Sequence, residues 1–394
     1  MKARYEQFGG IISTANPDLT VFVDRDFMRN LGFTGSALWS GVDSGYLSAP
    51  ITAHFNLTRR CLKGCENCYV SASSDAVDLL STAQAKTIID ELAKMSVLTV
   101  AFGGGEPFLR EDIFEIARYA QQKGIRATAT TNGWHITPDI ADKCGVFDHI
   151  HVSADLGDGG VEPEERVWHG AIELLRGSGI PAGINFIVDS RGFGNLERLF
   201  RYGDKNDVRQ IMLLRFKAHG RAKTKYDDYK LSQAQNIGFY PLVKRLAKRY
   251  GIRPMVDCSF LPMICFHRPK KKSLEFFGAE GCRGGDHIAE IDADGLIRCC
   301  SFCEDYAGKA AEVEQLWSNS PHFRRYRDWI KRAPEPCRSC DYLELCRGGC
   351  HCVALALAGD IMAADPECPL VAAYLVSSRK TGVATKTTRC LSKI

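Results

Sequence analysis

The chain has 394 residues, which is long enough for two or three domains with separate cores. Its formal charge of +4 is small for that length and counts all 17 cysteines as neutral, so the composition gives no reason to expect a nucleic-acid partner. The opening MKARYEQFGG lacks an apolar signal segment, and no apolar run approaches the length of a membrane span. We therefore expect a cytoplasmic protein without a membrane partner, in which the thiols bind metal instead of forming disulfides.

The composition along the chain divides it into four parts. Residues 1–50 are predicted to be an N-terminal extension, in which residues 9–32 are typical of a hairpin around Asn16-Pro17-Asp18 followed by a short helix. A β/α region is expected at residues 51–255 and a cysteine-rich region at 256–370. A C-terminal helix and tail are expected at 371–394.

Three cysteines follow the first expected strand of the β/α region. Cys61, Cys65 and Cys68 have the spacing C-x3-C-x2-C, and three thiolates so placed can hold three irons of a 4Fe-4S cluster. The fourth iron then has no protein ligand and is an open site for a small molecule, which is a catalytic arrangement. Two alternatives are a zinc site, which normally requires four protein ligands, and a set of buried structural cysteines.

Between residues 50 and 255, short β-rich segments alternate with helical ones, the pattern of parallel strands joined by crossover helices. Ser81 and Gln84 fit a capping box at the start of the first helix. Six β/α units predict an α/β fold, a partial (β/α)6 barrel. The expected strands are 51–57, 98–102, 125–130, 149–153, 182–188 and 210–216, and the expected helices are 81–95, 112–123, 138–144, 164–176 and 196–205.

Glycines and polar side chains follow these strands, at the edge where β/α barrels carry their active sites. Gly103-Gly104-Gly105-Glu106-Pro107 comes directly after the second strand, and its glycines allow close backbone approaches that a Cβ would forbid. Their amide and carbonyl groups can therefore reach a ligand. The polar candidates at the later strands are Thr131, Asn132, Ser153, Asp155 and Asn185, although the Asn132-Gly133 pair also suits a plain turn.

A second cysteine pattern lies beyond residue 280. Cys337, Cys340, Cys346 and Cys350 form C-x2-C-x5-C-x3-C, and upstream Cys282 and Cys300 frame Gly295 as C-x12-G-x4-C. Cys368 completes an ordered set of seven thiols. Paired C-x2-C units also bind zinc, so a zinc ribbon is the alternative to iron-sulfur clusters.

The cysteine triplet together with the Gly103–Pro107 element resembles the radical S-adenosylmethionine (SAM) superfamily, and the seven thiols match the pattern of its SPASM domain. The resemblance implies three 4Fe-4S clusters, one that binds SAM and two auxiliary ones. It implies SAM contacts from Gly104, Gly105, Glu106, Thr131, Asn132, Ser153, Asp155 and Asn185. By the family pattern Cys282, Cys300 and Cys350 hold the first auxiliary cluster, with Cys265 or Cys258 as an uncertain fourth ligand, and Cys337, Cys340, Cys346 and Cys368 hold the second.

The remaining thiols have no place in the pattern. Cys299, Cys303 and Cys352 neighbour ligands without matching it, and Cys144 and Cys390 lie elsewhere, so all five are expected to be buried or spare thiols.

The resemblance also implies a reaction. Reduction of SAM at the open iron releases methionine and a 5'-deoxyadenosyl radical, which removes a hydrogen atom from an unactivated C–H bond. Members with a SPASM domain most often modify peptides, so we expect a maturase of a ribosomally made precursor. Alternatives are a maturase that forms thioether or carbon-carbon crosslinks, one that forms formylglycine, and, in another class, an iron-sulfur electron carrier or a zinc-bound scaffold without catalysis.

A narrower resemblance concerns the leader of the precursor. YEQFGG, VDRDFMRNLG and the DCSF segment at 257–260 are similar to maturases of precursors with nitrogen-fixation-type leaders, some of which excise tyramine and leave an α-keto-β-amino acid. The N-terminal extension is too short for a leader-recognition domain, so a small separate leader-binding protein is expected as a partner. The precursor peptide and a reducing electron donor such as flavodoxin or ferredoxin are the other expected partners. Basic runs at 215–225, 244–253 and 268–272 suit an acidic leader or, as we favour, solvated faces.

Overall fold

A computed structural model describes residues 1–14, 19–41, 43–156, 163–276 and 278–380. Six parallel strands form the middle of a ten-stranded sheet and alternate along the chain with helices, which confirms the predicted α/β fold. The strands are β4 (Thr52–Thr58), β5 (Thr99–Gly104), β6 (Arg126–Thr131), β7 (His149–Ala154), β8 (Ala182–Val188) and β9 (Ile211–Arg215). The helices are α2 (Thr82–Lys94), α3 (Ile113–Gln122), α4 (Pro138–Lys143), α5 (Pro163–Gly177), α6 (Leu196–Lys205), α7 (Tyr226–Tyr229) and α8 (Gln233–Tyr250).

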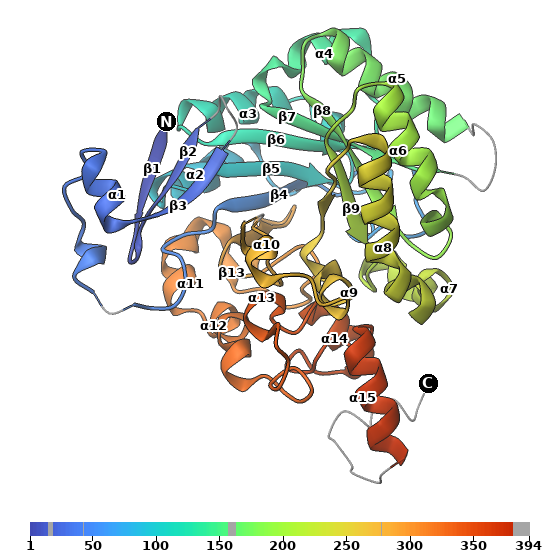
Figure 1. Ribbon diagram of the computed structural model, residues 1–394. Coiled ribbons are helices and arrows are strands. Elements are labelled where there is room, and N and C mark those ends of the chain that lie inside the picture. Colours follow the sequence, from blue (N-terminus) through green and yellow to red (C-terminus); the bar gives the residue numbers. More distant parts are fainter. Residues whose placement is uncertain (15–18, 42, 157–162, 277, 381–394) are drawn as a thin grey trace.

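The alternation of side chains along β4 explains why the strand lies where it does. Ala53, Phe55 and Leu57 are fully buried, whereas His54 between them is only partly buried. The buried set belongs to the main apolar core together with one face of α2, which begins at the predicted Ser81–Gln84 capping box. Because successive side chains of a strand point to opposite faces, His54 lies on the other face of the sheet. Figure 1 shows α3 to α6 on the outer side of the strands and the C-terminal region on the other side.

The N-terminal extension is a small sheet of its own with strand order β1-β2-β3. The predicted hairpin is confirmed as the antiparallel pair β2 (Gly9–Thr14) and β3 (Leu19–Asp24), followed by α1 (Arg25–Asn30); its turn lies outside the described residues. β1 (Lys2–Glu6) adds a strand that the sequence analysis missed. The buried Arg4 donates to the carbonyl of Pro50 at 2.8 Å and to Glu6 at 2.8 Å, which ties this sheet to the start of the β/α region.

The cysteine-rich region continues the central sheet. β10 (Met255–Val256) extends one edge beside β9, and β11 (Ile288–Ile291) pairs in parallel with β4 at the other edge. The sheet then ends with β12 (Leu296–Arg298) and β13 (Gly308–Lys309). Its helices are α9 (Leu261–Phe266), α10 (Lys271–Phe276), α11 (Val313–Asn319), α12 (Pro321–Arg327), α13 (Leu343–Cys346), α14 (His351–Ala358) and α15 (Pro369–Lys380). None of the helices in the described ranges is long and apolar enough to cross a membrane.

A buried ion pair joins the two regions. Arg215, at the end of β9, donates to the two carboxylate oxygens of Asp365 at 2.6 and 3.0 Å and to Glu367 at 2.6 Å. The Arg215 and Asp365 side chains are 1% and 0% exposed, so neither charge has water as a substitute partner. Removal of one partner leaves the other charged, buried and unpaired.

We expect Asp365→Ala to lower the free energy of unfolding by about 3–5 kcal/mol, because it isolates the buried Arg215 guanidinium. Chemical denaturation of the anaerobic holoenzyme measures this change. Asp341→Ala is the matched control, since Asp341 is exposed and pairs with the exposed Arg268 only at 3.9 Å. The control should cost about 1 kcal/mol or less. Equal losses in the two variants would contradict the role given to Asp365.

Candidate active site

The cysteine triplet lies on a loop that directly follows β4. Two backbone bonds close the base of this loop, from Cys61 N–H to the carbonyl of Ser73 at 2.9 Å and from Ser73 N–H to the carbonyl of Arg59 at 3.0 Å. Cys61, Cys65 and Cys68 are each partly exposed. Three partly exposed thiols on one loop fit a cluster that is held at three irons and accessible at the fourth.

Two N–H groups point at sulfur atoms of this loop. The side-chain amide of Asn132 lies 3.5 Å from Cys61 Sγ, and the backbone N–H of Ala72 lies 3.4 Å from Cys68 Sγ. Hydrogen bonds to thiolate sulfur are one means by which a protein sets the potential of a bound cluster. The predicted residue Asn132 therefore has a direct place beside the triplet.

The glycines after β5 hold the cysteine loop. Gly105 N–H donates to the carbonyl of Thr58 at 2.7 Å, and Glu106 N–H donates to the carbonyl of Arg60 at 2.8 Å. A Cβ at Gly104, where φ is +126°, would meet the Thr58 carbonyl oxygen at 2.3 Å, and one at Gly105 would meet that of Arg60 at 2.2 Å. The glycines are thus required to bring β5 against the loop, a role beyond the ligand contact for which they were singled out.

Glu106 is fully buried, and both of its oxygens are already engaged. Oε1 accepts from the Thr131 hydroxyl at 2.9 Å and from Phe108 N–H at 3.2 Å, and Oε2 accepts from Asn132 N–H at 2.8 Å. Burial raises the pKa of the Glu106 carboxyl to about 7, and these hydrogen bonds oppose the shift. In this arrangement Glu106 orients the Thr131-Asn132 turn beside the triplet.

The other predicted contacts lie at the carboxyl ends of neighbouring strands. Ser153 is near the end of β7, in register with Asn185 on β8, and the Asn185 amide lies 3.4 Å from the Thr130 hydroxyl on β6. Asp155 pairs with Lys63 of the cysteine loop at 3.3 Å. The structure therefore gathers the predicted residues along one edge of the sheet around the triplet.

A second segment holds the cysteine loop from the opposite side. Arg221, in the short 3-10 helix η5 (Gly220–Lys225), donates from its backbone N–H to Cys68 O at 3.0 Å, from Nε to Cys65 O at 3.0 Å and from a terminal nitrogen to Ala72 O at 2.6 Å. Gly220 lies so close that a Cβ would meet the Tyr69 carbonyl oxygen at 2.3 Å. The sequence analysis missed this contact, although Arg221 belongs to the basic run 215–225.

That run is not a solvated face. Arg215 and Lys217 are 3% and 7% exposed; Arg215 pairs with the buried Asp365, and Lys217 pairs with Asp257, whose side chain is 10% exposed. Lys223, by contrast, is exposed and pairs with Glu304. The expectation of a solvent-facing run was therefore wrong for its first part, where the cations are drawn inward by buried carboxylates.

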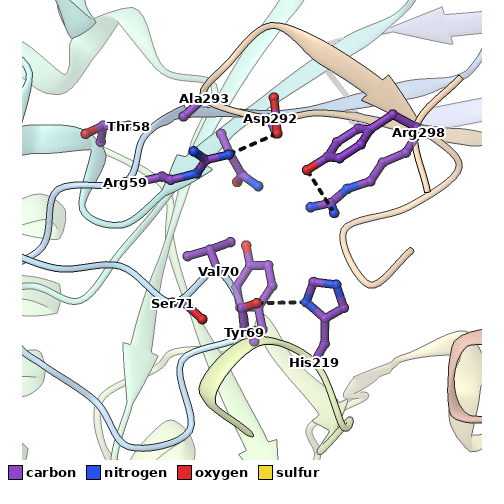
Figure 2. A pocket seen from close by; sticks show the side chains of 12 residues that line it. Thr58, Arg59, Tyr69, Val70, Ser71, His219, Asp292, Ala293 and Arg298 are labelled. Carbon is purple, nitrogen blue, oxygen red and sulfur yellow. Dashed lines mark hydrogen bonds and ion pairs between the residues drawn. The ribbon is translucent and has the colours of Figure 1, made fainter. Parts of the chain in front are cut away.

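A pocket of about 130 Å³ lies between the cysteine loop and the hairpin β11–β12. Figure 2 shows Tyr69 and His219 on one side of it and Arg59, Asp292 and Arg298 on the other. His219 Nδ1 lies 2.8 Å from the Tyr69 carbonyl oxygen, and Arg59 pairs with Asp292 at 3.2 Å. The pocket therefore combines residues from the cysteine loop with residues more than 200 positions later in the chain.

A buried polar network lines the same region. Asn56 donates to Glu290 Oε1 at 2.5 Å, and Arg298 donates through its terminal nitrogen to Glu290 Oε1 at 3.3 Å. Arg298 also donates to the carbonyl of Cys303 at 2.6 Å. Burial raises the pKa of Glu290 to about 7, and the Arg298 charge opposes this shift. The network fixes the face that the cysteine-rich region presents toward β4.

The upstream thiols, Cys258 and Cys265, lie in different places. Cys258 is near Cys282 and Cys350, and burial together with the charges of Asp257 and these thiols raises its pKa well above the usual value. Cys265 instead packs with Cys346 and Cys340. Of the two candidates for the first auxiliary set, only Cys258 is therefore close to that set.

The second auxiliary set lines a largely apolar cavity of about 380 Å³. Its wall contains Cys337, Cys340, Cys346 and Cys368, with Tyr342 and Val371 between them. Three of these thiols belong to residues 337–346 and Cys368 comes from a later segment, and Cys265 lines the same cavity. Four thiols are enough to ligate every iron of a 4Fe-4S cluster. The residues present thus fit the cluster that the pattern predicts.

Comparison with known proteins identifies the β/α region. Residues 55–193 match the model of the Radical SAM superfamily. The chain is 29% identical to the mycofactocin maturase MftC of Mycobacterium ulcerans over 82% of its own length and 88% of the relative's. It is 27% identical to the PqqA peptide cyclase of Granulibacter bethesdensis over 84% of its length and 90% of the relative's. The crystal structure of Streptococcus suis SuiB bound to precursor peptide SuiA has the same fold, with a TM-score of 0.73, 18% identity and coverage of 93% and 98%.

We expect Arg221→Met to weaken iron retention at the cysteine triplet by about 10-fold or more, because the two side-chain hydrogen bonds that Arg221 donates to the carbonyls of Cys65 and Ala72 are lost. Iron remaining after anaerobic dialysis against a chelator measures the effect. Lys223→Met is the matched control, since it removes a cation from the same 3-10 helix without contact to the loop. Equal iron retention in Arg221→Met and in the wild type would show that the Arg221 side chain does not hold the cysteine loop.

Glu106 predicts a pH dependence of stability. A carboxyl whose pKa is raised on folding stabilises the fold fully at pH values below the pKa of the unfolded chain, near 4.5, and loses that contribution as pH rises through about 7. Between about pH 6 and pH 8 the wild type should lose about 1 kcal/mol more than Glu106→Gln. Thermal unfolding of both proteins across this range measures the difference in slope, which also cancels the shared contribution of Glu290. Parallel curves would show that Glu106 does not titrate there.

Proposed function

We propose that this radical SAM enzyme is a maturase that modifies a ribosomally made precursor peptide. The proposal rests on the length over which the chain is similar to the PqqA peptide cyclase. The similarity covers 84% of the chain, so it includes the cysteine-rich region as well as the radical SAM domain. The fold shared with SuiB, a protein that binds a precursor peptide, supports the same substrate class.

The triplet Cys61, Cys65 and Cys68 would hold the radical-generating 4Fe-4S cluster, with SAM along the strand ends at Gly104, Thr131 and Ser153. When bound, these cofactors supply reductive cleavage of SAM and removal of a hydrogen atom from a C–H bond. Asn132 would hydrogen-bond the sulfur of Cys61, and Glu106 would hold the Thr131-Asn132 turn in place. The chain thereby sets the position and potential of the cluster.

The pocket between the cysteine loop and β11–β12 is where we place the modified residue of the peptide. Tyr69 and His219 would offer ring surfaces to a side chain of the peptide. Both rings pack against Phe302, with ring centroids 5.2 Å from it for Tyr69 and 6.0 Å, edge-on, for His219. Arg59 and Arg298 provide hydrogen-bond donors for peptide carbonyls. The side chains on its two sides would keep water away from the reacting C–H bond.

Two auxiliary clusters complete the proposal. Cys337, Cys340, Cys346 and Cys368 would ligate the second, in the cavity that they line. Cys282 and Cys350 would ligate the first together with Cys258, the upstream thiol that lies beside them. Cys300, which the family pattern adds to this set, lies beside Cys282 and would ligate the same cluster; it also contacts Cys303 and Cys352.

The narrower reaction we propose is excision of tyramine from a tyrosine in a precursor with a nitrogen-fixation-type leader. Each of the three motifs that suggest it has a defined role in the fold. Glu6 and Gly9 of YEQFGG help dock the N-terminal sheet, Asp24 caps the helix in VDRDFMRNLG, and DCSF supplies both the partner of Lys217 and the thiol Cys258. A small leader-binding protein would present the precursor, and a flavodoxin or ferredoxin would supply electrons.

The intact mass of the precursor after anaerobic coexpression with this enzyme and a leader-binding partner tests the proposal. Loss of a tyramine-sized fragment is the expected result. Loss of two hydrogens would indicate a crosslink or an oxidation and would replace the narrower proposal with that reaction. An unchanged mass, without uptake of solvent deuterium that would signal epimerisation, would overturn the peptide-maturase proposal.

Cys65→Ala is the control that ties the modification to the cluster. We expect it to abolish formation of 5'-deoxyadenosine from SAM under reducing conditions, because one of the three thiolates of the radical cluster is missing. Continued SAM cleavage by this variant would contradict the assignment of the triplet. Cys144→Ala removes a fully buried thiol of the β/α region and should leave cleavage intact.

A further inference from the structure

An exposed basic segment lies beside the second auxiliary set. Arg268 lines the cavity that contains the four thiols of this set, and three lysines follow it closely in the chain. The four cations, which we call the basic rim, are all exposed: Arg268, Lys270, Lys271 and Lys272. We propose that the basic rim is the docking surface for a small acidic electron-carrier protein that reduces this enzyme.

One side chain, Tyr342, separates the basic rim from the thiols. The ammonium group of Lys271 lies 5.7 Å from the centre of the Tyr342 ring, and the Tyr342 hydroxyl donates to the carbonyl of Pro269 at 2.6 Å. Tyr342 is buried and lines the cavity together with Cys340 and Cys346. Figure 1 shows α10, which carries Lys271, beside α13. A protein bound to the rim would therefore lie close to the thiols that are proposed to hold a cluster.

Ion pairs within the chain do not account for these cations. Among the described residues, the carboxylate that pairs with the basic rim is Asp341, which is 70% exposed and lies 3.9 Å from Arg268. Lys271 and Lys272 belong to the first turn of α10, where the helix dipole disfavours positive charge, and this turn has no acidic residue to offset them. Exposed cations gathered on one surface raise its positive potential, which attracts an acidic partner.

An exposed apolar side chain lies next to the basic rim. Leu370, on α15, lines the same cavity as Arg268 and is 43% exposed. Interfaces of electron carriers are small, and complementary charges around them speed association more than they strengthen the complex. An apolar centre with a charged edge therefore suits a partner that binds, transfers one electron and leaves.

The inference rests on the proposed function only for the need of an external electron donor. In each transfer the carrier loses one electron and the enzyme gains one, and no covalent bond forms between them. Binding and reduction are both measured without a precursor peptide, so failure of this proposal is distinguishable from failure of the maturase proposal.

The test compares variants of the full-length anaerobic holoenzyme, with purified flavodoxin as the probe. The rim variant combines Lys271→Glu with Lys272→Glu, and its control combines Lys244→Glu with Lys248→Glu on α8, where both lysines are exposed, so the net charge is the same. In low salt we expect the rim variant to raise the Kd for flavodoxin by about 10-fold or more and to slow reduction of the enzyme similarly. The control should stay within about twofold of the wild type. Calorimetry gives the Kd, and stopped-flow absorbance of the flavin gives the rate.

Salt and a neutral variant distinguish an electrostatic surface from a folding defect. The wild-type affinity should fall as ionic strength rises, and less steeply in the rim variant. Lys271→Gln with Lys272→Gln removes the charges without reversing them and should show an intermediate loss. All variants should keep the wild-type iron content and the EPR signal of the dithionite-reduced enzyme.

Three results would overturn the proposal. The first is an equal change of Kd in the rim variant and its control, and the second is a wild-type Kd that does not depend on salt. The third is loss of precursor binding in the rim variant while flavodoxin binding is retained, which would assign the surface to an acidic leader.

Discussion

The arrangement of the cysteine-rich region depends on one carboxylate. Asp365 receives the guanidinium of Arg215 and also accepts the backbone N–H of Cys350 at 3.0 Å, so the end of β9 and the backbone of Cys350 share one partner. Two residues beyond Arg215, Lys217 pairs with Asp257, the neighbour of Cys258. The free energy needed to remove such charges from water offsets much of the attraction between them. The clearest effect of these pairs is therefore to fix the relative positions of the segments that they join. The strand end therefore sets where two thiols from distant segments, Cys258 and Cys350, lie relative to each other.

The cysteine loop is held mainly through hydrogen bonds to its backbone carbonyls. Gly104 and Gly105 hold it from β5, and Arg221 holds it from η5, in both cases through backbone carbonyls of the loop. Thiolates repel one another before iron arrives, so a loop shaped by its backbone keeps its form whatever the charge on sulfur. Two side chains at the strand ends contact this loop: Asn132 reaches Cys61 Sγ and Asp155 pairs with Lys63.

The sequence allowed the regular elements to be predicted, because the strands and helices of residues 51–255 are periodic and local. The triplet and the seven-thiol pattern could also be recognised from their spacing in the sequence, and the cluster ligation inferred from them stays a prediction. What could not be predicted depends on contacts across the chain: β11 is four residues long and pairs with β4, more than 230 residues away. Glu106 had a predicted ligand role, whereas its oxygens are taken by Thr131, Asn132 and Phe108. The contacts of Arg221 could not be predicted from the basic run 215–225, because composition does not distinguish a cation that donates to carbonyls from one that faces water.

Charge balance bears on how the thiols of this region would bind metal. Three buried cations have carboxylate partners: Arg298 with Glu290, Lys217 with Asp257, and Arg215 with Asp365. Burial, together with the neighbouring thiols Cys350 and Cys303, raises the pKa of Cys282 to about 12. Without metal such a thiol stays protonated, and with metal it becomes a thiolate whose charge the bound cation neutralises. Metal binding and the folded arrangement of the cysteine-rich region are therefore linked by the same electrostatic requirement.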